Sequence, residues 1–257
     1  MKATLTVLGS GTSMGVPTLG CDCAVCHSKD PHDRRTRPSI MLEYGSKYVL
    51  IDTTPDFYAQ AVREHITHVD AVFYTHTHAD HILGIDDLRP LSYHHKPDKL
   101  PLYAQPDAAA FLRRMFAYIF DANYKFGGLA QLELHPIDGP VDVFGVRFEP
   151  VILIHGETQI YGYRFGSGAY LTDHSEIPES SLDQLRGLDI LFLDALRHKP
   201  HPTHSTVKNS LAIVERLKPK RAFFTHICHD LGHEATNLSL PKHVRLAYDG
   251  MKLEFEI

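Results

Sequence analysis

The amino-acid sequence predicts an α+β fold in which two β-sheets pack face to face with helices on the outside. Short runs of β-prone residues recur in both halves of the chain, and helical segments separate them. The 257 residues, 43% hydrophobic and 22% charged, are enough for one large core or two modest ones. The pattern alone leaves a doubly wound sheet open as the alternative.

The first half of the chain predicts short strands and one early helix. The four predicted strands are residues 3–8, 40–44, 48–51 and 71–74. After the third strand, Thr54 can cap a helix that has Pro55 in its first turn and ends near His65. The fourth strand leads directly into a cluster of histidines.

The second half also predicts short strands separated by helices. Its predicted strands are residues 143–154, 160–165, 169–171, 190–193, 222–224 and 253–257. Its predicted helices are residues 106–120, 178–185 and 206–217. The apolar stripe of the first helix is expected to pack in the core; its members are Phe111, Leu112, Met115 and Phe116.

The charge balance argues against a protein that binds nucleic acid or lipid. The chain has 26 basic and 31 acidic residues, a net charge of −5 with histidine neutral. No overall positive field therefore attracts a phosphate backbone or an anionic membrane. Nor does the sequence contain an apolar stretch of about 18 residues. We expect a cytoplasmic protein with neither a membrane nor a nucleic acid as its partner.

The chain contains 19 histidines, an unusually large number for its length. Four potential metal ligands lie within residues 76–81, in the run His-Thr-His-Ala-Asp-His. On a loop after a buried strand, His76 and His78 can converge on one ion. Asp80 and His81 can then face a second ion a few ångströms away. The spacing therefore predicts a pair of metal ions at this strand end.

With this loop the sequence resembles the metallo-β-lactamase superfamily, whose hydrolases carry His-x-His-x-Asp-His after a central strand of an αββα sandwich. Further along, the resemblance matches three residues at predicted strand ends: His155, Asp173 and His226. It covers nearly the whole chain and implies a single hydrolase domain over residues 1–257.

The resemblance also implies how two divalent cations, zinc or manganese, would be held. One metal would be bound by His76, His78 and His155. The other would be bound by Asp80, His81 and His226, with Asp173 bridging both. Asp52 matches an early aspartate of the family that positions the histidine loop. Its alternative role is to cap the helix that follows.

Charge favours a phosphate ester as the substrate. Two divalent cations, two aspartates and a bridging hydroxide leave about +1, which matches a phosphodiester monoanion. The hydroxide would attack phosphorus beside Asp80, and the leaving oxygen would need a proton. The loop at residues 194–204 supplies candidate general acids, of which His204 is the first choice and His201 the second.

Three of the four cysteines, Cys21, Cys23 and Cys26, lie within six residues, which is too close for ordinary disulfides and suits a structural zinc ion. This loop, at about residues 20–38, resembles the phosphoribosyl 1,2-cyclic phosphate phosphodiesterase family of the carbon–phosphorus lyase pathway. That resemblance implies His229 as the fourth zinc ligand, with Cys228 as the alternative. It also places His204 facing the substrate.

We therefore expect a dinuclear metal-dependent hydrolase of small phosphodiesters, cyclic ones first, with a small-molecule phosphate ester as its partner. A transfer RNA processing endonuclease shares the histidine pattern, but the negative charge and the lack of a long basic insertion disfavour it. A lactone or thioester hydrolase could use the same site, and a non-catalytic scaffold is disfavoured because all seven ligands are present. The sequence leaves open the substrate, the metal and the oligomeric state, a homodimer included.

Overall fold

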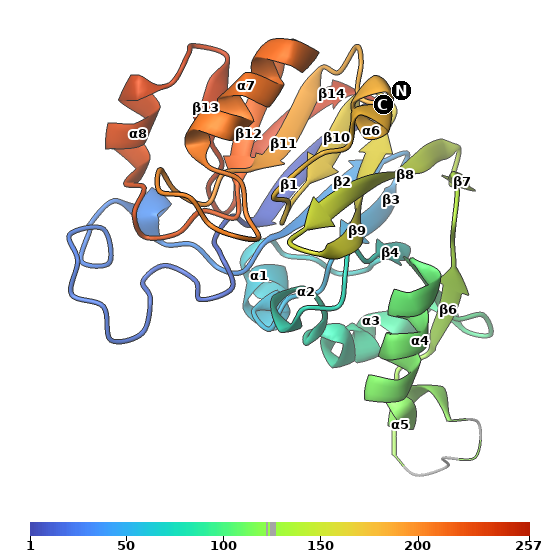
Figure 1. Ribbon diagram of the computed structural model, residues 1–257. Helices are drawn as coiled ribbons and strands as arrows, with labels where there is room; N and C mark the ends of the chain where they lie inside the picture. The colour runs from blue at the N-terminus through green and yellow to red at the C-terminus, as the bar shows by residue number, and fades with distance from the viewer. Residues whose placement is uncertain (122, 124–126) are drawn as a thin grey trace.

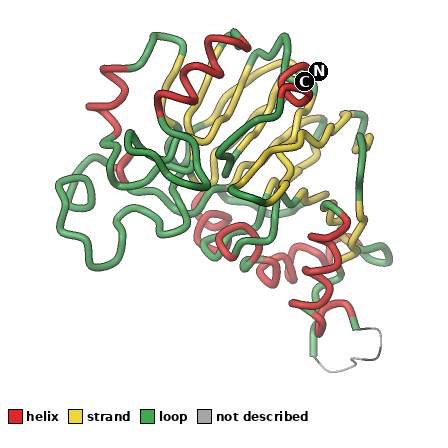
Figure 2. The backbone as a smooth tube through the Cα atoms, viewed as in Figure 1, coloured by secondary structure: helices red, strands yellow, loops and turns green. Residues whose placement is uncertain are grey.

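The computed structural model describes residues 1–121, 123 and 127–257. In this part of the chain, the strands form two seven-stranded sheets that lie face to face, with helices on their outer sides (Figure 1). Figure 2 shows the same layers, with strands in the middle and helices at the periphery. The predicted sandwich is confirmed, and the doubly wound alternative is wrong.

The first sheet has the order β14-β1-β2-β3-β4-β5-β6. Its strands are antiparallel from β14 to β3 and parallel from β3 to β6. The bounds are β1 (Lys2–Gly9), β2 (Ser39–Tyr44), β3 (Lys47–Ile51), β4 (Ala71–Phe73), β5 (Leu100–Ala104), β6 (Leu132–Pro136) and β14 (Lys252–Glu256). The parallel half places the ends of β3 and β4 side by side.

The second sheet has the order β13-β12-β11-β10-β9-β8-β7. Here β7 to β10 are antiparallel neighbours, and β10 to β13 are parallel. The bounds are β7 (Val141–Val143), β8 (Val146–His155), β9 (Thr158–Phe165), β10 (Gly168–Leu171), β11 (Ile190–Asp194), β12 (Arg221–Thr225) and β13 (Val244–Leu246). The carboxyl ends of β10, β11 and β12 therefore meet at one edge.

Most helices lie between strands on the outer faces. The described α-helices are α1 (Phe57–Arg63), α2 (Ala79–Ile82), α3 (Arg89–Ser92), α4 (Pro106–Met115), α5 (Ala117–Phe120), α6 (Glu179–Asp183), α7 (Val207–Leu217) and α8 (His233–Ser239). Short 3₁₀ turns are η1 (Pro31–Asp33), η2 (Ile85–Leu88) and η3 (Tyr93–His95). Thr206 caps α7 by accepting a hydrogen bond from the amide of Asn209 at 3.2 Å. The helix expected to be capped by Thr54 instead begins at Phe57, with Asp56 at its N-cap position.

Some predicted elements differ in their boundaries. The strand expected over residues 143–154 is divided by a turn at Phe144 and Gly145, which both have positive φ. The helix expected over residues 106–120 is interrupted at Phe116, whose backbone leaves the helical region. Met115, the last residue of α4, is 46% exposed, so its expected place in the core is wrong.

Three clusters of buried hydrophobic residues lie between the layers of the sandwich. One fills the space between the sheets and contains Phe73, Phe148 and Tyr163. A second lies between the first sheet and its helices, and a third between the second sheet and α6, α7 and α8. Both faces of each sheet are therefore covered, which explains the continuous apolar runs in their central strands.

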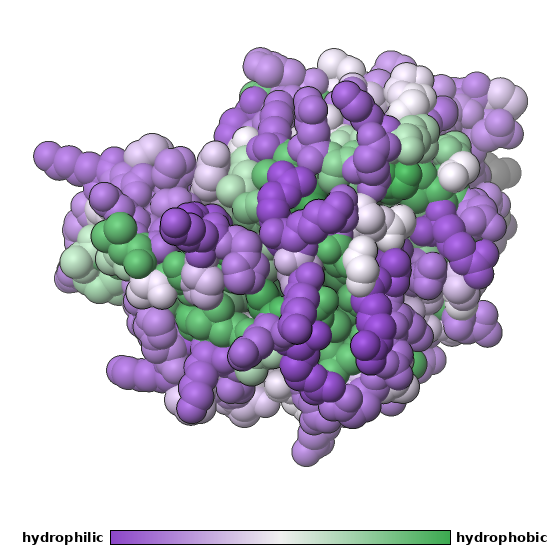
Figure 3. Space-filling view, turned by 90° about the horizontal axis from the view of Figure 1, so that it is seen from above, coloured by the Kyte–Doolittle hydropathy of each residue, from purple (hydrophilic) through white to green (hydrophobic). Residues whose placement is uncertain are grey.

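The view from above shows hydrophilic side chains over much of the surface, with hydrophobic areas between them (Figure 3). Among the described residues, no helix combines the length and the apolar character needed to cross a membrane.

Candidate metal centre

The histidine loop, residues 76–81, follows β4 and runs into α2, and hydrogen bonds tie it to the turn that follows β3. The amide of Thr53 donates to the carbonyl of His81 at 2.8 Å, and the amide of Gly84 donates to the carbonyl of Thr53 at 3.0 Å. A Cβ atom at Gly84 would lie 2.1 Å from the carbonyl oxygen of Thr54. The absence of a side chain at Gly84 therefore lets the two segments approach closely.

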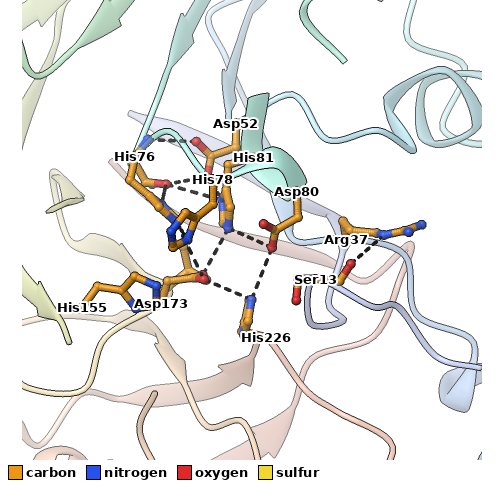
Figure 4. Close-up of polar contacts among 12 residues, drawn as sticks. Ser13, Arg37, Asp52, His76, His78, Asp80, His81, His155, Asp173 and His226 are labelled. Carbon is orange, nitrogen blue, oxygen red and sulfur yellow. Dashed lines mark hydrogen bonds and ion pairs between the residues drawn. The ribbon is translucent and has the colours of Figure 1, made fainter. Parts of the chain in front are cut away.

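Asp52 is fully buried and fixes the orientation of two neighbours in this loop. Its carboxylate accepts hydrogen bonds from the amide of Thr75 at 2.8 Å, the hydroxyl of Thr75 at 2.9 Å and Nδ1 of His81 at 2.7 Å. A proton of His81 is thereby held on Nδ1, and Nε2, the nitrogen open to a metal, points away from Asp52. Figure 4 shows Asp52 on the far side of His81 from Asp80.

The first group of candidate ligands contains three histidines, His76, His78 and His155. Nε2 of His76 lies 3.0 Å from Nδ1 of His78. Nδ1 of His155 donates to the carbonyl of Thr203 at 2.8 Å, which leaves Nε2 free to face the pair. One nitrogen from each ring lies within 4.8 Å of the others, a spacing that suits one metal ion.

The second group combines two carboxylates and two imidazoles, from Asp80, His81, Asp173 and His226. Nε2 of His81 lies 3.3 Å from both Asp80 and Asp173, and Nε2 of His226 lies 3.1 Å from Asp173. Asp173 also lies 4.0 Å from His76, so it stands between the two groups (Figure 4). This is the place that the family resemblance implies for a bridging ligand.

Buried carboxylates control the charge of the second group. Burial lowers the pKa of His81, but Asp173, Asp80 and Asp52 outweigh it and hold that pKa well above its usual value. In the same way, Asp173 overcomes burial and raises the pKa of His226 to about 10. Both shifts show a strongly negative potential at this place, which stabilises a cation.

The polar atoms of the second group fit metal ligation. Among the described residues, Oδ2 of Asp80, Nε2 of His81 and both ring nitrogens of His226 are buried without a hydrogen-bond partner. Such groups are costly to bury unless something satisfies them. Divalent cations accept this mixture of imidazole nitrogen and carboxylate oxygen, so the donor set fits the metals that the fold family implies.

Several site residues have strained backbones at strand ends. Asp52, Asp173 and His226 follow β3, β10 and β12, and all three have positive φ, between 57° and 66°. This conformation costs a non-glycine residue about 1–3 kcal/mol. The surrounding strands direct Asp173 and His226 towards each other in the second ligand group and hold Asp52 against His81.

The general-acid candidates occupy different places. Nδ1 of His204 donates to Asp194 at 2.8 Å, and the ring of His204 stacks on His226 with centroids 4.6 Å apart. His201 is one ring further out, with its centroid 5.0 Å from that of His204. The structure thus brings His204 against both ligand groups and leaves His201 at the rim.

Asp194 is a site residue that our sequence reasoning did not select. It is fully buried at the end of β11, between the strands that carry Asp173 and His226. The signal was present, because an aspartate directly after a predicted strand repeats the pattern of Asp173. Parallel neighbours would have placed both carboxylates at the same edge.

The cysteine loop forms a separate cluster. Sulfur atoms of Cys21, Cys23 and Cys26 lie 3.1, 3.4 and 3.6 Å from Nδ1 of His229. All four ligand atoms lie within 4.8 Å of one another. The sulfur of Cys228 instead accepts a hydrogen bond from the amide of Asp230 at 3.4 Å. The geometry thus favours His229 over Cys228 as the fourth member.

Comparison with known proteins identifies the fold family. A model of the β-lactamase superfamily domain matches residues 47–227. The chain belongs to the metallo-β-lactamase superfamily. A crystal structure described as a new diphosphatase from the PhnP family is 61% identical, has a TM-score of 0.94, and matches over 99% of this chain and 98% of that one. This superfamily member is therefore related to the PhnP family.

Other relatives of this superfamily member are more distant. An octanoyltransferase of Porphyromonas gingivalis is 36% identical over 251 residues, 96% of this chain and 50% of that protein. A ribonuclease Z of Bradyrhizobium diazoefficiens is 27% identical over 148 residues, 54% of this chain and 47% of that protein. The chain spans about half the length of these curated relatives. Zinc-bound PqqB from Methylobacterium extorquens, 18% identical with a TM-score of 0.77 over 97% of this chain and 99% of that one, supports the fold.

Proposed function

We propose that this protein is a metal-dependent phosphodiesterase that hydrolyses small phosphate esters, cyclic ones included. One observation carries the proposal: two adjacent ligand groups lie beside His204, whose ring contacts His155 and His226 and is held by the buried Asp194. Relationship to a diphosphatase of the PhnP family supports hydrolysis at phosphorus.

Seven residues would hold two divalent cations. His76, His78 and His155 would bind one, Asp80, His81 and His226 the other, and Asp173 both. When bound, such a pair lowers the pKa of water and stabilises negative charge on a phosphate oxygen. Asp80 and Asp173 contribute two negative charges, against the four positive charges of two divalent cations. The positive charge left at this place would attract a monoanionic phosphodiester, although the whole protein has a net charge of −5.

The protein's own side chains supply orientation and a proton. Asp52 keeps the proton of His81 on Nδ1, and the carbonyl of Thr203 does the same for His155. Asp194 holds the Nδ1 proton of His204, so the Nε2 of His204 is directed into the pocket. From that position a protonated His204 can donate to the leaving oxygen of the ester.

The cysteine cluster would bind a structural zinc ion through Cys21, Cys23, Cys26 and His229. It would join the loop at about residues 20–38 to the segment after His226. Residues 1–257 would form one domain around the pocket, a view supported by the central core, which contains residues from Ala3 to Phe255.

A second candidate activity is hydrolysis of a diphosphate linkage. The relative at 61% identity is described as a diphosphatase, and the same attack on phosphorus would cleave an ester or an anhydride. The two activities differ only in the leaving group, so a direct comparison of substrates separates them.

The test is a substrate panel with protein reconstituted with zinc or manganese. Cyclic and linear phosphodiesters, a diphosphate ester, a lactone and structured RNA are compared, with His78→Ala as the background control. We expect the highest kcat/KM for a cyclic phosphodiester. Hydrolysis of the lactone alone, or salt-dependent binding and cleavage of RNA alone, would contradict the proposal.

A further inference from the structure

A turn after β1, residues 12–15, runs past the end of β12. The amide of Ile227 donates to the carbonyl of Ser10 at 3.0 Å, and the amide of Thr12 donates to the carbonyl of Ile227 at 3.1 Å. Ile227 directly follows His226, a member of the second ligand group. These contacts place the turn beside that group.

Ser13 is the residue of this turn that lies nearest to the second ligand group. Figure 4 shows it between Arg37 on one side and Asp80 and His226 on the other. Asp80 and His226 are buried, whereas Ser13 is exposed, so Ser13 lies where this group meets the solvent. In the described part of the chain, neither the hydroxyl nor the amide of Ser13 has a hydrogen-bond partner. Both donors are therefore available to a ligand.

Arg37 holds the turn in place. Its Nε donates to the carbonyl of Ser13 at 3.1 Å, and its Nη1 lies 3.0 and 3.1 Å from the two carboxylate oxygens of Asp56. Because Asp56 pairs with the guanidinium, Arg37 is not a free cation for an anionic ligand. The bond from Arg37 also polarises the peptide group between Ser13 and Met14, which makes the amide of Met14 a stronger donor.

Two glycines allow the turn to lie against the segment that precedes β2. A Cβ atom at Gly11 would be 2.9 Å from the carbonyl oxygen of Arg35. Gly15 has a φ of +66°, and a Cβ atom there would be 3.3 Å from the same oxygen. A side chain at either position would strain the backbone. The donors of the turn are therefore oriented before a ligand arrives, which lowers the entropic cost of binding.

We infer that this turn binds an oxygen of the substrate's phosphate group and that the hydroxyl of Ser13 makes the contact. The carboxylates of Asp80 and Asp173 can only accept hydrogen bonds, so an anionic oxygen on this side of the site needs a donor from elsewhere. A hydroxyl and the adjacent amides supply such donors. A phosphodiester has two non-bridging oxygens and a lactone one carbonyl oxygen, so an additional donor favours attack at phosphorus. The inference rests on the proposed function, which places the phosphate at the metal ligands.

Binding of inorganic phosphate tests the turn without catalysis. Phosphate is titrated calorimetrically into the zinc-reconstituted wild-type protein, Ser13→Ala, Ser13→Thr and Ser180→Ala. Ser180 is a matched control, because it is an exposed serine on α6, a helix that covers the outer face of the second sheet. We expect Ser13→Ala to weaken binding about tenfold, the usual effect of a lost hydrogen bond to a charged group. Ser13→Thr, which keeps a hydroxyl, should restore most of the affinity, and Ser180→Ala should not change it.

Two results of this titration would overturn the inference. Phosphate affinity in Ser13→Ala equal to that of the wild type would show that the hydroxyl makes no contact. Loss of affinity in Arg37→Ala, with Ser13→Ala unaffected, would assign the anion to the guanidinium instead. Zinc content by mass spectrometry and thermal melting of each variant show whether a weaker affinity reflects loss of metal or of the fold.

Hydrolysis then separates this inference from the proposed function. For bis(4-nitrophenyl) phosphate, Ser13→Ala should raise KM about tenfold and change kcat much less, because the contact is made to the bound ester as well as in the transition state. If the ester is not hydrolysed but phosphate binding still depends on Ser13, the phosphodiesterase proposal fails and the inferred phosphate contact stands. If Ser13→Ala and the wild type hydrolyse it with the same KM, the inference fails and the phosphodiesterase proposal stands.

Discussion

Replacement of Asp52 by asparagine tests how the histidine loop is oriented. Asparagine has nearly the same shape, and its oxygen can still accept the hydrogen bond from the amide of Thr75, now made to Oδ1 at 2.8 Å. Its NH₂ group would then stand where Oδ2 faces Nδ1 of His81 at 2.7 Å. Nδ1 must become an acceptor, so the proton of His81 moves to Nε2, the nitrogen proposed to bind metal.

The expected cost falls on metal binding more than on folding. Loss of a hydrogen bond that orients a histidine ligand lowers metal affinity about 10- to 100-fold, which corresponds to about 1.4–2.8 kcal/mol. The free energy of unfolding of the metal-free protein should fall by about 1 kcal/mol, the usual worth of one buried hydrogen bond. Competition with a chromogenic chelator measures the affinity, and urea unfolding measures the stability.

The control is Asp249→Asn. Asp249 is another shielded aspartate, and it accepts hydrogen bonds from the backbone and side chains of Ser10 and Thr36. It is not among the candidate ligand groups of the described residues, so its variant should lose stability and keep metal affinity. Asp52→Asn with wild-type affinity for two metal equivalents would refute the proposed role of Asp52.

Three further variants probe other parts of the molecule. Cys23→Ser should reduce zinc content by about one equivalent per chain and lower the melting temperature; unchanged zinc by mass spectrometry would exclude the separate site. His204→Ala should lower kcat about 100-fold or more with metal content intact, whereas His201→Ala should change kcat much less; equal losses would contradict the assignment. Gly84→Ala places a Cβ 2.1 Å from the carbonyl of Thr54 and should destabilise the fold by about 1–3 kcal/mol; an unchanged urea midpoint would argue against this contact.

The sequence predicted the layers well because local patterns carry that information. Alternation in β1 and the hairpin of β2 and β3 are local properties, and the structure has them within two residues. Two strands at the parallel end of the first sheet, β5 and β6, were missed. β5 contains Pro101 and β6 ends at Pro136. Proline argues against a strand because it cannot donate to the ladder, and only pairing with neighbours reveals these strands.

The same distinction between local patterns and tertiary structure decides which site residues the sequence could predict. Spacing alone predicted the histidine loop, since His76, His78, Asp80 and His81 are neighbours in sequence. His155, Asp173 and His226 came only from family resemblance, because no local pattern joins residues so far apart. Asp194 was missed since its function depends on the parallel order of β10, β11 and β12, which is a tertiary property.

The placement of the site explains why such distant residues meet. The histidine loop follows a strand of the first sheet, whereas His155 ends a strand of the second sheet and Asp173 and His226 follow two others. The second ligand group therefore joins the two sheets across their boundary. Its carboxylates are almost completely buried, and two of its residues, Asp173 and His226, have positive φ. Both features cost stability, and a bound cation would offset them by attraction to the carboxylates. Folding of the sandwich and metal affinity are thereby linked, because whatever holds the sheets in register also sets the distances between the ligands.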